Sequence, residues 1–125
     1  MEGYSDPLIF MTRIAFSLGA ILGLTAVIAG ALGAHALKGS MTPEQLDSYE
    51  TAVRFQMYHA MMLIILGLLT QKFTSSLFKW IGAGWAGGTL LFSGSIYLLL
   101  LTPIKVGIVT PIGGSILIIG WALLI

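Results

Sequence analysis

The sequence has no cysteine, and only six Lys and Arg and five Asp and Glu residues occur among its 125 positions. Without cysteine, disulfides, thiolate metal sites and cysteine nucleophiles are excluded. The scarcity of charge excludes an ordinary soluble domain: such a domain is charged at about a quarter of its positions, and this chain at 9%. The formal net charge of +1 gives no indication of nucleic-acid binding.

Long apolar runs take the place of the missing polar surface. Hydrophobic residues make up 57% of the chain, and most lie in the runs Ile14–Ala34, Phe55–Leu69, Leu77–Leu101 and Val106–Ile125. A helix needs about 20 residues to cross about 30 Å of hydrocarbon. The second run reaches this length only if its helix also includes Glu50–Arg54.

These runs predict an all-α membrane protein with four transmembrane helices in an antiparallel bundle. We expect an N-terminal tail at residues 1–12 and a single transmembrane domain at residues 13–125. The expected helices cover residues 13–37, 43–70, 77–101 and 106–125. Ala34-His35-Ala36 resembles a signal-peptide cleavage site, but the apolar run before it exceeds the roughly 7–15 residues of a signal peptide. We therefore expect this run to be retained as the first membrane helix.

The second helix has a strong start signal. Thr42 can be the N-cap, Pro43 is favoured at the first helical position, and Gln45 completes a capping box with Thr42. A helix from Pro43 to Thr70 would be about 42 Å long, whereas the hydrocarbon core is about 30 Å thick. We expect this helix to extend beyond the membrane at its N-terminus.

A group of polar residues lies where this helix enters the membrane. Ionisable groups at membrane depth are costly and mark candidate functional sites. Helical spacing places Glu50, Arg54 and Tyr58 on one face and Gln56 and His59 on another. The candidate ligand-binding or structural cluster comprises His35, Glu50, Arg54, Gln56, Tyr58 and His59.

Two interpretations of this cluster remain open. His35 and His59 lie toward the same side of the membrane and could ligate haem or a metal, or each could bond a neighbouring carbonyl or hydroxyl, which is the more common role. Arg54 could bind an anionic headgroup, a carboxylate or a quinone, or Glu50 could neutralise it as an i,i+4 partner. Ser93, Ser95 and Tyr97 are expected to form hydrogen bonds between helices.

Glycines recur at helical spacing in three of the expected helices. Small residues on one stripe let helix backbones approach closely in lipid. We predict helix-packing seams at Gly19, Gly23, Gly30, Gly33, Gly87, Gly94, Gly113 and Gly120.

Several motifs together indicate a family. The runs 30–37 (GALGAHAL), 50–60 (ETAVRFQMYHA), 88–97 (GTLLFSGSIY) and 110–114 (TPIGG) with Trp121 follow one another in order. They resemble the small four-helix membrane protein family of unknown function that includes bacterial YgdD and animal transmembrane protein 256. The resemblance implies a bacterial plasma membrane or a mitochondrial inner membrane, and it implies no activity.

The expected function follows from what these patterns contain. The apolar runs hold no constellation of catalytic residues and no cofactor motif, so we expect neither an enzyme nor a bound cofactor. The glycine seams favour a structural or interaction protein in the lipid bilayer, acting as a homo-oligomer or as a subunit of a larger membrane complex. The alternatives are a binder of haem, metal or a small hydrophobic or anionic ligand at the His35/Arg54/His59 end, and a small oligomeric transporter. Lysine and arginine are balanced between the two sides, so the positive-inside rule does not fix orientation.

Overall fold

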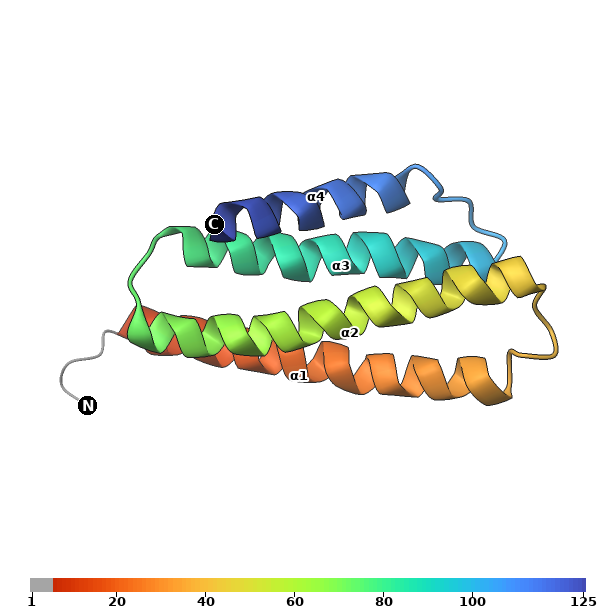
Figure 1. Ribbon diagram of the computed structural model, residues 1–125, viewed down its shortest axis with the longest axis horizontal. Coiled ribbons are helices and arrows are strands. Elements are labelled where there is room, and N and C mark those ends of the chain that lie inside the picture. The colour runs from red at the N-terminus through yellow and green to blue at the C-terminus, as the bar shows by residue number, and fades with distance from the viewer. Residues whose placement is uncertain (1–5) are drawn as a thin grey trace.

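The structure, a computed structural model, describes residues 6–125, and this part of the chain folds into four helices. They are α1 (Asp6–His35), α2 (Pro43–Lys72), α3 (Leu77–Leu101) and α4 (Val109–Leu124). Figure 1 shows them running back and forth along one long axis, joined by short connections. The predicted all-α, antiparallel four-helix class is confirmed.

The first helix begins earlier than the sequence predicted. Because α1 starts at Asp6, the expected tail at residues 1–12 is wrong for residues 6–12, while residues 1–5 lie outside the described part. Pro7 is well tolerated in a first helical turn, where its missing N–H has no partner to lose. The buried Thr12 forms a 2.7 Å hydroxyl–hydroxyl bond with Thr70, which fixes this part of α1 against α2.

The last helix is shorter than the sequence predicted. α4 begins at Val109 rather than at residue 106, and its 16 residues span about 24 Å. The preceding Gly107 is a poor helix former, and the Val109 N–H closes a turn onto the Val106 carbonyl. Among the described residues, three helices are long and apolar enough to cross a membrane, α1 from Ile9, α2 and α3. Three of the four expected full-length spans are therefore present, and α4 is a shorter apolar helix.

The start of α2 has the predicted capping box. The Gln45 N–H donates to the Thr42 hydroxyl at 3.1 Å, and the Thr42 N–H donates to the Gln45 side-chain oxygen at 3.0 Å. The 30-residue helix is about 45 Å long. Because the hydrocarbon core takes about 30 Å of this, α2 extends beyond the membrane at its acidic N-terminal end.

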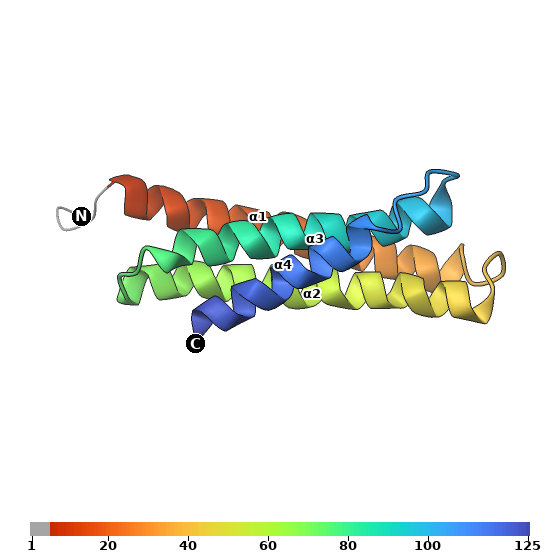
Figure 2. The ribbon, with the colours of Figure 1, turned by 90° about the horizontal axis from the view of Figure 1, so that it is seen from above.

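The helices pack as two hairpins. α1 lies along α2 and α4 lies along α3, while α2 and α3 join the two pairs. α1 and α3 touch each other at few positions, both contact α2, and residues of the three helices line a groove. Figure 1 places α1 and α4 at opposite edges of the molecule, and Figure 2 shows α4 crossing α3 obliquely. The groove between α1 and α3 is what positions the candidate site.

The glycine stripe of α1 faces α2. A Cβ added at Gly19 would lie 2.7 Å from the Ala60 carbonyl oxygen, and one added at Gly33 would lie 2.7 Å from the Tyr49 ring. Gly23 and Gly30 lie farther from α2, at ordinary contact distance. The two backbones can therefore approach as closely as they do only because these positions carry no side chain.

The seam between α3 and α4 differs from the prediction. Gly113 and Gly120 lie against α3, but no atom of the described chain comes within 4 Å of a Cβ added at Gly87 or Gly94. Gly88 makes the close approach instead, since a Cβ there would lie 2.9 Å from Leu117. Adjacent residues on a helix are turned by about 100°, so of the pair Gly87-Gly88 only the second faces α4.

Candidate functional site

Gln56 connects three helices from the interior of the protein. Its side chain is 5% exposed. The Nε2 group donates to the Leu22 carbonyl at 2.9 Å and to the Thr25 hydroxyl at 2.6 Å, both on α1. From α3, the Tyr97 hydroxyl donates to Gln56 Oε1 at 2.6 Å. A buried amide at this depth is satisfied only because α1 and α3 both supply partners.

One buried hydroxyl beside this network has no partner. Ser93 donates to the Ala52 carbonyl at 2.7 Å. Thr89, one turn earlier on α3, is 1% exposed, and its Oγ1 has no hydrogen-bond partner within residues 6–125. An unsatisfied buried hydroxyl costs about 1–3 kcal/mol, so it calls for a specific explanation.

Residues of this network line a cavity of about 210 Å³ between α1, α2 and α3, whose accessible surface is nonetheless almost entirely apolar; we call it the inner polar cavity after these residues. A water molecule occupies about 30 Å³ of liquid, so the space admits a larger guest. The cavity is lined by Leu22, Thr25, Gln56, Thr89, Leu90, Ser93, Gly94 and Tyr97. The second buried polar atom that lacks a partner in the described chain, Trp85 Nε1, does not line it.

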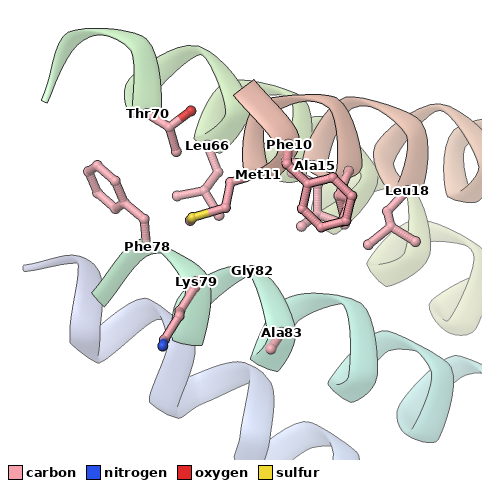
Figure 3. A pocket seen from close by; sticks show the side chains of 12 residues that line it. Phe10, Met11, Ala15, Leu18, Leu66, Thr70, Phe78, Lys79, Gly82 and Ala83 are labelled. Carbon is pink, nitrogen blue, oxygen red and sulfur yellow. The ribbon is translucent and has the colours of Figure 1, made fainter. Parts of the chain in front are cut away.

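A second space, the apolar cavity, of about 310 Å³ lies farther along the same three helices. Figure 3 shows Met11, Leu66 and Phe78 converging from α1, α2 and α3, while the Lys79 nitrogen points away from Met11. That nitrogen lies 5.3 Å from the Trp80 ring centre, an arrangement that suits a cation–π contact. The apolar cavity therefore offers hydrocarbon contacts and no free charge directed inward.

His59 lies in the core and joins α2 to α4. The Trp121 Nε1 group donates to His59 Nε2 at 3.1 Å, and His59 Nδ1 lies 2.7 Å from the Phe55 carbonyl oxygen. Because Nε2 accepts, the proton of a neutral ring sits on Nδ1 and is donated to Phe55. Both ring nitrogens are then occupied, and neither is available to a metal.

The structure separates the two histidines that the sequence suggested as a pair. His35 is exposed in the last turn of α1. His59 is next to Ala60, which faces Gly23, and Gly23 is 12 residues from His35 along α1. This is about 18 Å of helix. A bis-histidine site is therefore wrong for this chain, and residues 6–125 contain no cluster of three or more His, Cys, Asp or Glu side chains suited to a metal.

The acid–arginine face of α2 points outward. Glu50 and Arg54 are 4.0 Å apart, with side chains 54% and 49% exposed, and Arg54 also donates to the Thr51 hydroxyl at 3.2 Å. Tyr58 is 48% exposed. Of the six predicted cluster residues, only Gln56 and His59 are therefore in the interior, while His35, Glu50, Arg54 and Tyr58 lie on the surface.

Sequence reasoning found part of the interior network. Ser93 and Tyr97 bond to α2 as expected, and Ser95 bonds Thr110 of α4 at 2.5 Å. Thr25 and Thr89 were missed. A polar residue within an apolar run is the signal that marks both of them, but it does not reveal which helix each one faces.

Comparison with known proteins places the chain in a family. The family model described as "Protein of unknown function (DUF423)" matches residues 29–114. The UPF0382 membrane protein SAB0533 of Staphylococcus aureus (strain bovine RF122 / ET3-1) is 47% identical over 116 residues, covering 90% of this chain and 93% of that protein. The UPF0382 membrane protein YwdK of Bacillus subtilis (strain 168) is 40% identical over 116 residues, covering 90% and 94%.

No solved structure matches this chain. The bacterial relatives are named as membrane proteins, and the chain has apolar helices long enough to span a bilayer. Both findings confirm an integral membrane protein, and the small family of unknown function indicated by the motifs is confirmed as well. The chain is therefore a member of the DUF423 family, a group of membrane proteins of unknown function.

Proposed function

We propose that this protein binds a small amphiphile inside the membrane, with the polar end of the ligand in the inner polar cavity. The observation that carries the proposal is a cavity of about 210 Å³ lined by residues of α1, α2 and α3, among them Thr89, whose hydroxyl has no partner within residues 6–125. Ligand sites are characteristically concave and mostly apolar, with a few convergent polar groups. This cavity is concave and its accessible surface is mostly apolar, with polar residues from three helices in its lining.

The position of the cavity supports entry from the lipid. α1 and α3 touch at few positions, and both cavities lie between them over α2. Leu90, which lines the inner polar cavity, is 65% exposed on the membrane-embedded surface. An amphiphile dissolved in the bilayer can reach the site between the two helices without crossing water.

The lining supports binding rather than catalysis. Among the described residues that line the inner polar cavity, the polar groups are hydroxyls and one amide, with no carboxylate, imidazole or amine. Such groups orient a ligand but are poor proton-transfer catalysts near neutral pH. We therefore propose a carrier, sensor or ligand-dependent structural protein rather than an enzyme.

The test is to fill the cavity from within. Gly94 lines it, and a Cβ there meets no atom within 4 Å, so Gly94→Leu places a side chain in the space that the ligand would take. Ala20→Leu adds the same bulk on the exposed face of α1 and is the matched control. Wild type and Ala20→Leu purified in mild detergent should carry a co-purifying small molecule, detected by native mass spectrometry. Gly94→Leu should not carry it, and equal content in all three proteins would count against the proposal.

A second candidate function is association with another transmembrane helix. Gly87 and Gly94 lie on one face of α3, seven residues apart, and neither has an atom of the described chain within 4 Å of an added Cβ. Open glycines at this spacing suit the close approach of another helix in lipid. Cross-linking in native membranes tests this: Gly87→Leu should abolish a dimer or hetero-complex band that wild type and Ala20→Leu both show.

A further inference from the structure

We propose that the apolar cavity holds one acyl chain of an anionic phospholipid, with the phosphate of that lipid outside the cavity at Lys79. This lipid site is separate from the inner polar cavity and from the function proposed there. The shape of the apolar cavity, its place at the membrane surface and the charge beside it carry the proposal.

The apolar cavity extends along the helix axes. Its lining on α1 runs from Phe10 to Leu18, and its lining on α2 runs from Leu63 to Thr70. These stretches correspond to about 12 Å and about 10 Å of helix. The accessible surface of the cavity is almost entirely apolar. Because the acyl chains of a bilayer run along the membrane helices, a space of this shape and surface suits one such chain.

One end of the apolar cavity lies near the membrane–water interface. The polar turn at residues 73–76 joins α2 to α3 at this end. Close to the turn, Trp80 is 61% exposed, and tryptophan is enriched at the level of the lipid headgroups. Thr70 and Phe78 therefore line the cavity near the headgroups, while Leu63 lines it deeper in the hydrocarbon. A lipid seated here would have its headgroup beside the turn.

Lys79 is the charged residue that lines this cavity. Its nitrogen points away from Met11 (Figure 3) and lies 5.3 Å from the Trp80 ring centre. Lys79 forms no ion pair within residues 6–125. An ammonium group has three hydrogen-bond donors, so the contact with the ring leaves donors for a phosphate. The apolar stem of Lys79 can therefore border the acyl chain while its charged end meets the headgroup.

The charge around the turn favours an anion. At this end of the bundle, residues 6–125 carry three cations and one acid: Arg13, Lys72, Lys79 and Asp6. The opposite end carries three of each: Lys38, Arg54, Lys105, Glu44, Asp47 and Glu50. α3 also begins beside the turn, and its N-cap Ser76 makes no side-chain hydrogen bond, so the positive end of the helix dipole adds to the same charge. An anionic headgroup is therefore favoured over a neutral one.

The experiment compares phosphatidylglycerol with phosphatidylcholine of the same acyl chains. Each lipid is titrated against the purified protein in mild detergent and followed by native mass spectrometry. We expect wild type to bind phosphatidylglycerol about fivefold more tightly, which is the effect of one basic residue near an anionic lipid. Lys79→Gln should remove most of this preference, and Lys79→Arg should keep it. Lys72→Gln is the matched control: it removes the same charge from the same end, does not line the cavity, and should keep the preference.

A second substitution tests the place of the acyl chain. Ala83 is exposed and lines the apolar cavity, so Ala83→Leu puts a larger side chain where the acyl chain would lie. This variant should bind both lipids more weakly than wild type. Ala20→Leu, on the exposed face of α1, should bind both as wild type does. Circular dichroism should show the wild-type helix content in both variants.

Three results would overturn the proposal. Equal affinity of wild type for the two lipids would refute an anionic headgroup. A preference that Lys79→Gln retains in full would place the headgroup elsewhere, and unchanged binding by Ala83→Leu would place the acyl chain outside the apolar cavity. Gly94→Leu fills the inner polar cavity and should bind phosphatidylglycerol as wild type does, whereas a loss of binding in this variant would contradict the separation of the two sites.

Discussion

Replacing Thr89 by valine should make the ligand-free protein more stable. Valine has nearly the same shape as threonine and lacks only the hydroxyl. Thr89 is 1% exposed, and its hydroxyl has no partner within residues 6–125. Folding therefore removes this hydroxyl from water without a hydrogen bond that would compensate for the cost. Its removal should raise the free energy of unfolding by about 1 kcal/mol, at the lower end of the range for an unsatisfied buried group.

Thr70 provides the matched control. It is 4% exposed, lies within α2, and its hydroxyl bonds both the Thr12 hydroxyl at 2.7 Å and the Gly67 carbonyl at 2.7 Å. Thr70→Val removes a bond between α1 and α2 and should lower the free energy of unfolding by about 0.6 kcal/mol or somewhat more, as is typical between membrane helices. The same chemical change should thus have opposite signs at the two positions.

The measurement is reversible unfolding in mixed micelles with increasing sodium dodecyl sulfate, followed by circular dichroism and tryptophan fluorescence. Both variants should keep the wild-type helix content. If Thr89→Val is destabilised as much as Thr70→Val, the Thr89 hydroxyl has a partner in the folded protein. The premise that this buried hydroxyl is unsatisfied would then be refuted.

The same assay tests three other features, and NMR tests a fourth. Gln56→Leu should lower the free energy of unfolding by about 2 kcal/mol, because three hydrogen bonds of about 0.6 kcal/mol each are lost. Tyr97→Phe should lower the free energy of unfolding far less in the Gln56→Leu background than in the wild type. Additive effects of the two substitutions would refute the hydrogen bond between Tyr97 and Gln56. Gly113→Ala should lower the free energy of unfolding by about 1–3 kcal/mol, because the added methyl group overpacks against α3. Gly87→Ala, where the added methyl group meets open space, should be neutral or slightly stabilising. Equal effects would contradict the close packing of α4 against α3 at Gly113. Nitrogen NMR of labelled His59 should show a protonated Nδ1 and an unprotonated Nε2 that loses its bond in Trp121→Phe, and a protonated Nε2 in wild type would contradict the assignment. Glu50→Gln should change stability by less than about 0.5 kcal/mol, since the ion pair is exposed and 4.0 Å long, and a loss above about 1 kcal/mol would restore a structural role for that pair.

The sequence is sufficient for features that depend on local chemistry. The capping box at Thr42 and Gln45 forms as predicted because its partners are three residues apart. Likewise, α3 has the same bounds as the apolar run from Leu77 to Leu101, which polar residues and Thr102-Pro103 delimit. In both cases the interactions that decide where the helix begins or ends lie within a few residues of that end.

Features that depend on the rotation and offset of helices could not be predicted in the same way. Periodicity shows that Gln56 and His59 share a face of α2 but does not say that Gln56 meets Tyr97 and His59 meets Trp121. Of the neighbouring pair Gly87 and Gly88, only the orientation of α4 decides which glycine is in contact. His35 was placed near His59 because both belong to helix segments on one side of the membrane, and the axial offset of about 18 Å emerges only from the contact between Gly23 and Ala60.

The hairpin architecture has a consequence for how the protein is assembled. α1 can pair with α2 through its glycines, and α3 with α4, as soon as each pair has entered the bilayer. The bonds from Tyr97 to Gln56 and from Ser93 to Ala52 join the two pairs, so they form only when one hairpin docks on the other. The walls of the inner polar cavity come from both hairpins, and the cavity is therefore the last part of the molecule to be completed. A guest that occupied it would contact residues of both hairpins and would therefore stabilise their docked arrangement.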